Sequence, residues 1–115
     1  MSYLQHARAL ALSFDGAWED YPWEPTNPVY KTAKGKIFLF AGEREDGAAT
    51  LTVKLTPDEG AAALLLPFVS IAPYVGRYGW VTATVATDVE WDIASPWVER
   101  SYELVTRPPR RPQNR

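Results

Sequence analysis

The segment ATLTVKLTPDE, residues 49–59, joins a strand to a helix and sets the class of the fold. Apolar residues at 51, 53 and 55 alternate with polar residues at 50, 52 and 54, which is the period of a strand with one buried face. Thr56 then supplies a helix N-cap, Pro57 fits the first helical position, and Glu59 completes a capping box. The sequence therefore predicts a half-buried strand that runs directly into a helix reaching about Leu66.

Further strands are predicted on both sides of this segment. A short strand over 29–32 and a longer one over 37–42 flank a tight turn at Lys34-Gly35. The longer strand begins Ile-Phe-Leu-Phe, and apolar residues on both faces are typical of a central strand. Alternation over 80–86 predicts another strand after the helix.

Helices are predicted at both ends of the chain. Ser2 and Gln5 form a capping box, and apolar residues then recur at helical spacing as far as Ser13. Asp92 is the expected N-cap of the last helix, which places Pro96 in its first turn, where a missing N–H group costs little. The core-facing stripe expected for this last helix is Ala94, Trp97, Val98, Ser101, Leu104 and Val105.

Two segments between these elements are expected to be irregular or short. Residues 17–28 contain three prolines, which rule out a regular helix. We expect an ordered loop here, pinned by Trp18 and Trp23. Residues 68–71 are expected to add only a short extended piece.

These elements predict one α+β domain over residues 1–106, with a single antiparallel sheet packed by helices in the order α-β-β-β-α-β-α. A chain of 115 residues fits one domain. Residues 107–115, RPPRRPQNR, contain three prolines and no apolar anchor, which predicts a disordered basic tail.

The charge of the chain is unevenly distributed. Four of its 12 basic residues lie in the last nine positions, so residues 1–106 have 8 basic and 14 acidic side chains, a balance of −6. A domain that acidic does not attract duplex DNA by its overall field. Binding to nucleic acid therefore requires a local basic patch or the tail.

Four motifs, taken in order, resemble the MmcQ/YjbR family. They are KGKIF at 34–38, VKLTPDE at 53–59, GRYGWV at 76–81 and SYELV at 101–105. The resemblance covers about residues 1–106 and implies a compact fold, an antiparallel sheet packed by helices, similar to that of type III secretion chaperones. It also implies DNA binding through a proposed double-wing motif, with no enzymatic activity. The chain departs from the family pattern in its acidic body, in Tyr74, where many members have His, and in Pro96.

Basic side chains near the predicted sheet are the candidate nucleic-acid-binding residues: Lys31, Lys34, Lys36, Lys54 and Arg77. Phosphates are held by lysine and arginine, and four or five such contacts give weak, salt-sensitive binding. The alternative is that these are solvated side chains, which also discourage pairing at a sheet edge. The other hairpin tip, residues 43–47, is mostly acidic, so two equivalent DNA-gripping wings are not supported.

Aromatic residues in loops are the candidates for binding another partner: Trp18, Trp23, Tyr74 and Tyr78. Tryptophan and tyrosine dominate protein-interface hot spots, and aromatics beside a basic residue such as Arg77 can stack on bases or on a small ligand. The alternative is that these side chains pack onto the domain itself.

The residue types needed for catalysis are sparse. The chain has no cysteine and a single histidine, His6, and no nucleophile-elbow motif, glycine-rich phosphate loop or calcium-loop spacing surrounds its other polar residues. We therefore expect no enzyme, no metal and no cofactor.

Two functions are expected from these observations. The first is a non-enzymatic DNA-binding domain, and the alternative is a protein- or small-ligand-binding module that uses the aromatic loops and the exposed sheet. No apolar run is long enough to span a membrane, so we expect no membrane contact. The absence of cysteine and of a targeting signal suits the cytoplasm.

Overall fold

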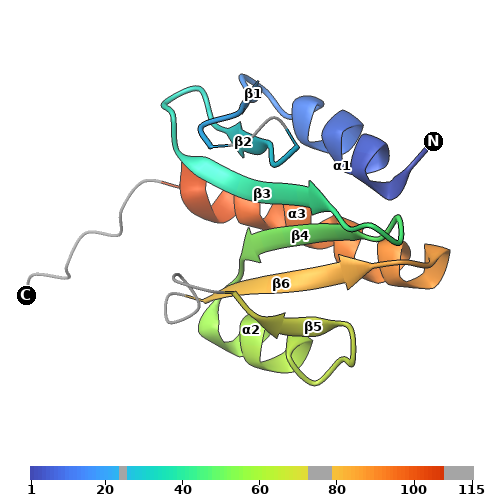
Figure 1. The fold of residues 1–115 in the computed structure, drawn as a ribbon. Helices are drawn as coiled ribbons and strands as arrows, with labels where there is room; N and C mark the ends of the chain where they lie inside the picture. Colours follow the sequence, from blue (N-terminus) through green and yellow to red (C-terminus); the bar gives the residue numbers. More distant parts are fainter. Residues whose placement is uncertain (24–25, 73–78, 108–115) are drawn as a thin grey trace, which may run out of the picture.

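The predicted fold class is confirmed. The computed structural model describes residues 1–23, 26–72 and 79–107 and contains one antiparallel sheet with helices (Figure 1). In chain order the elements are α1 (Tyr3–Leu12), β1 (Trp18–Asp20), β2 (Val29–Lys31), β3 (Ile37–Glu43), β4 (Ala49–Lys54), α2 (Pro57–Ala63), β5 (Val69–Ile71), β6 (Trp80–Val85) and α3 (Asp88–Thr106).

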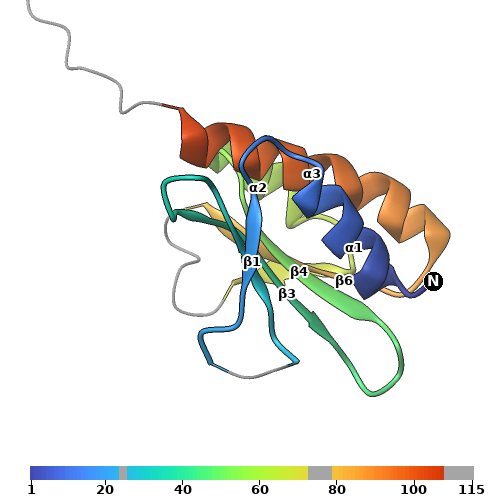
Figure 2. The same cartoon turned by 90° about the horizontal axis from the view of Figure 1, so that it is seen from above.

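The helices cover one face of the sheet and leave the other open. The strand order is β1-β2-β3-β4-β6-β5, with every neighbouring pair antiparallel. Figure 2 shows α1 and α3 side by side on one side of the strands. In β4 and β6 every second residue is buried and the others are half-buried. The apolar core therefore lies between the sheet and the helices, and we call the opposite side the open face.

Both edge strands are short, and one lies where a loop was expected. The prediction of a loop over 17–28 is wrong for β1, which pairs with β2 and places Trp18 opposite Lys31. The three prolines of this segment begin only at Pro22, so they leave the backbone of β1 free to pair. The expected extended piece near residue 70 is β5, which pairs with β6 at the other edge.

The predicted start of the last helix is also wrong. Thr87, not Asp92, is the N-cap of α3, and Glu90 closes a capping box with it. Pro96 therefore lies in the third turn, where it removes the N–H group that would bond to the carbonyl of residue 92. The helix continues through it because Ala94 and Val98 are buried on either side.

An extra residue in β3 decides which side chains face the core. Tyr30 pairs with Leu39 and Lys31 pairs with Ile37, so Phe38 has no partner of its own in β2. Such a bulge turns two successive side chains to the same side. Phe38 and Leu39 are both fully buried, and Phe38 packs against Tyr102 of α3 with ring centres 5.2 Å apart.

Ser101 of α3 links β3 to β4 where their ladder ends. The last paired residues are Leu39 and Val53. Beyond them, the Lys54 N–H group donates to Ser101 Oγ at 2.9 Å, and the Ser101 hydroxyl donates to the Phe38 carbonyl at 2.6 Å. Ser101 is completely buried. One side chain thus satisfies the Lys54 N–H group and the Phe38 carbonyl, which lie just beyond the end of the β3–β4 ladder.

Replacing this hydroxyl is expected to cost stability. Ser101→Ala leaves one backbone donor and one backbone acceptor in the core without their partner, which should lower the free energy of unfolding by about 2–4 kcal/mol. Urea denaturation followed by circular dichroism measures this. Ser95→Ala, on the same helix, is the control and should stay within about 0.5 kcal/mol of the parent. Equal effects of the two changes would contradict the role of Ser101.

Helix α2 begins as predicted and ends earlier than expected. The Thr56 hydroxyl accepts from the Glu59 N–H, and the Glu59 carboxylate accepts from the Thr56 N–H. The helix ends at Ala63 rather than at about Leu66. Glu59 also accepts two hydrogen bonds from Arg100 Nε, at 3.1 and 2.9 Å, which ties α2 to α3. The pKa of Glu59 is lowered by the backbone hydrogen bond from Thr56 and then by Arg100.

The contribution of Glu59 to stability is expected to depend on pH. Its pKa is lower in the folded chain than in the unfolded one, so its contribution is complete above the unfolded value of 4.5 and is lost as the pH falls through the folded value. Glu59→Gln should therefore lower the free energy of unfolding by about 1 kcal/mol at pH 7, and by less in acid. Urea denaturation at pH 7 and pH 3, with exposed Glu99→Gln as control, measures the difference. A Glu59→Gln effect that stays constant with pH would contradict the assignment.

Candidate functional site

Three lysines and one arginine gather around the C-terminal end of α3. The turn between β2 and β3 places Lys34 and Lys36 there, since the Gly35 N–H donates to the Thr32 carbonyl and Gly35 takes a φ of 85°. Lys54 ends β4, and Arg107 follows the last residue of α3. We call Lys34, Lys36, Lys54 and Arg107 the basic end.

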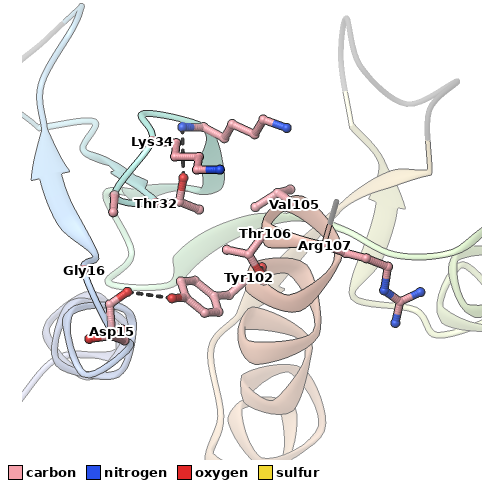
Figure 3. Close-up of a pocket in the computed structure, with 10 residues that line it drawn as sticks. Asp15, Gly16, Thr32, Lys34, Tyr102, Val105, Thr106 and Arg107 are labelled. Carbon is pink, nitrogen blue, oxygen red and sulfur yellow. Dashed lines mark hydrogen bonds between the residues drawn. The ribbon is translucent and has the colours of Figure 1, made fainter. Parts of the chain in front are cut away.

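Two adjoining depressions lie at the basic end. The first, about 300 Å³, is lined by Lys34, Lys36, Arg107 and residues that include Asp15, Thr32 and Tyr102. Figure 3 shows Lys34 and Arg107 on opposite sides of the end of α3, and the Tyr102 hydroxyl donates to the Asp15 carbonyl at 2.6 Å.

The second depression, about 340 Å³, extends the basic end toward the open face. Lys36 and Arg107 line it as well, together with Ile37, Lys54 and Trp80. Lys54 and Trp80 are direct neighbours across β4 and β6. The two depressions therefore form one continuous surface in which an aromatic side chain lies among cations.

The basic end differs from the rest of the described chain in its lack of ion pairs. Within residues 1–23, 26–72 and 79–107, each of the other basic side chains lies within 4 Å of a carboxylate: Arg8, Lys31, Arg44 and Arg100. No such carboxylate reaches Lys34, Lys36, Lys54 or Arg107 in those ranges. Among the described residues, these four positive charges therefore have no carboxylate that neutralises them.

Lys31 pairs with Ile37 at the start of β3, but its side chain lines neither depression of the basic end. Its ammonium group lies 2.8 Å from Asp20 Oδ2 and 5.1 Å from the centre of the Trp18 ring. The hydrogen bond from Lys31 lowers the pKa of Asp20. Lys31 therefore fastens β1 to β2. Another nucleic-acid candidate, Arg77, lies outside the described residues.

Of the candidate partner-binding aromatics, Trp18 and Trp23 lie in the described chain and both are well exposed. Trp18 is 42% exposed, and its Nε1–H donates to the Thr32 carbonyl. Trp23 is 66% exposed and stacks on Phe40 of the open face, with ring centres 6.1 Å apart. Tyr74 and Tyr78 lie outside the described residues.

Residues 12–104 match the sequence model of the YjbR family. The chain belongs to the YjbR family. No curated protein matches it.

Similar solved structures include two bacterial proteins. The YjbR chain shares 20% identity with Deinococcus radiodurans DR2400, which has a DUF419 domain, over 92% of its own length and 80% of that chain, with a TM-score of 0.78. A structural-genomics target from Pseudomonas syringae shares 17% identity over 90% of this chain and 98% of its own, with a TM-score of 0.70. At 20% and 17% identity, these similarities show that the chains share a fold.

A third depression in this YjbR domain contains a network that braces the fold. It measures about 340 Å³ and lies between α1, β1 and β2. Glu19 accepts hydrogen bonds from Arg8 Nε at 2.9 Å and from the Tyr30 hydroxyl at 2.8 Å. Burial and then the bond to Glu19 raise the pKa of Tyr30, so it stays protonated. His6 lies elsewhere on α1, with its ring 5.8 Å from that of Trp91.

Sequence reasoning missed two members of the site. Arg107 was assigned to the tail, but it is the C-cap of α3 and lies two residues beyond Val105, where the predicted helical stripe ends. Trp80 was not among the candidate residues, yet it is half-buried and faces the open side beside Lys54. Side chains alternate along a strand, and Val81 is buried, so the sequence could have placed Trp80 on the open face.

The described residues contain no cluster of three or more His, Asp or Glu side chains placed to hold a metal ion. In the same part of the chain, none of the helices has the length and apolar composition that crossing a membrane requires.

Proposed function

We propose that this YjbR domain binds DNA, without catalysing a reaction, through the basic end. The observation that supports this most strongly is the gathering of Lys34, Lys36, Lys54 and Arg107, which have no ion-pair partner among the described residues. Phosphate oxygens of a nucleic-acid backbone are natural partners for such cations.

The local charge favours an anion although the whole chain is acidic. The C-terminal end of α3 contributes about half a negative charge, and Asp15 also lines the first depression. Four positive side chains outweigh both. Because the balance of residues 1–106 is −6, the attraction is confined to this end, and binding should be weak and steeply dependent on salt.

The surroundings of the basic end suit binding rather than turnover. Its ionisable groups are lysines, an arginine, Asp15 and Tyr102, and the Tyr102 hydroxyl is engaged with a backbone carbonyl. No histidine lies there, since His6 packs against Trp91. A non-enzymatic role is therefore part of the proposal.

A gel-retardation experiment tests this function. At low salt the full chain should retard DNA, and the logarithm of the binding constant should fall with the logarithm of salt concentration with a slope of about −3 to −4, as expected for four phosphate contacts. Lys36→Glu should weaken binding about tenfold or more, and Lys34→Glu with Lys36→Glu should abolish it.

Two further variants complete this test. Arg44→Glu makes the same change in charge at the hairpin tip between β3 and β4, far from the basic end, and should bind like the parent. Replacing Arg110, Arg111 and Arg115 with Ser should weaken binding without removing it. Absence of retardation at low salt, or its complete loss with the tail variant, would contradict the proposal.

A further inference from the structure

The open face of the sheet displays an aromatic row next to the basic end. We define the aromatic row as Trp23, Phe40 and Trp80. Trp23 lies nearly parallel to Phe40, at 14° between planes, and Trp80 packs against Phe40 in a T-shaped arrangement, with ring centres 5.5 Å apart. The row runs from the β1–β2 loop across β3 and reaches β6.

The fold leaves this row on a face that no helix covers. Phe40 pairs with Thr52, which pairs with Thr82, and all three are half-buried rather than buried. The neighbouring Leu39, on the opposite face, is fully buried, and Figure 2 shows that the helices cover that face. Trp23 stacks on Phe40 and keeps 66% of its surface exposed in the described structure.

Cations flank the aromatic row at one end. Lys54 is the direct cross-strand neighbour of Trp80, and Lys36 lines the same depression as both. A ligand that stacks on the row therefore meets positive charge within one strand spacing, about 5 Å. A ligand that has flat apolar rings linked by an anionic backbone could stack its rings on the aromatic row and place its negative charges beside these cations.

Among nucleic acids, this surface favours a single strand. Unpaired bases expose their flat faces and stack on aromatic side chains, whereas the bases of a duplex stack on one another.

We propose that the open face binds single-stranded DNA, with bases stacked on Trp23 and Trp80 and phosphates held by Lys36 and Lys54. This rests on the proposed function, because the same cations are used, and it adds the strandedness of the DNA and the surface that recognises it.

Fluorescence anisotropy with the full chain at low salt tests the proposal. A labelled oligothymidine should bind about tenfold or more tightly than a labelled duplex of equal length. Trp23→Ala should weaken binding of the single strand about 5- to 150-fold, the loss expected for one stacked base. Trp23 is an exposed loop residue, so its removal leaves the core intact.

Two variants separate stacking from a change in folding. Trp23→Phe keeps a flat ring and should restore most of the affinity. Tyr21→Ala removes an exposed aromatic residue of the same loop that lines the depression near α1 instead, and should bind like the parent.

The outcomes distinguish this proposal from the one on which it rests. If single strand and duplex bind equally, and Trp23→Ala binds like the parent, stacking on the open face is overturned while DNA binding by the basic end stands. If neither probe binds the parent chain, DNA binding itself is overturned.

Discussion

The bulge at Phe38, next to Ser101, determines which face of the sheet the first residues of β3 occupy. Because side chains alternate along a strand, one extra residue reverses every position beyond it. It turns Phe38 into the core and Ile37 toward Lys54 and Trp80. The hydroxyl of Ser101 bonds to the Lys54 N–H group and the Phe38 carbonyl just beyond the end of the β3–β4 ladder. The composition of the basic end therefore depends on a contact between α3 and two strands.

A sheet covered on one side has to present its other side to solvent. Here that side combines threonines on β4 and β6 with the stacked rings of Trp23, Phe40 and Trp80. Of these rings, Trp23 is 66% exposed, while Phe40 and Trp80 are half-buried. Lys36 and Lys54, which have no ion pair within the described part of the chain, line the same depression as Trp80, so one ligand can contact both features.

Local signals predicted most of this fold, and long-range contacts account for what was missed. Alternation identified β4 and β6, and capping boxes identified the starts of α1 and α2. Thr87 and Glu90 form the same signal for α3, which was overlooked. The run Ile-Phe-Leu-Phe is apolar throughout, so no alternation reveals its bulge. Lys31 was grouped with the other lysines because its ion-pair partner, Asp20, is far from it along the sequence. The two meet only because β1 pairs with β2.

The proposed DNA site lies where the basic end meets the open face. Backbone amide NMR during titration of the full chain with an oligothymidine tests it most directly, because it locates the ligand without any substitution. We predict that amide signals of Lys36, Lys54 and Trp80 shift progressively while those of α1 stay unchanged. Shifts confined to α1 and the helix-covered side, or to residues 108–115, would contradict the account.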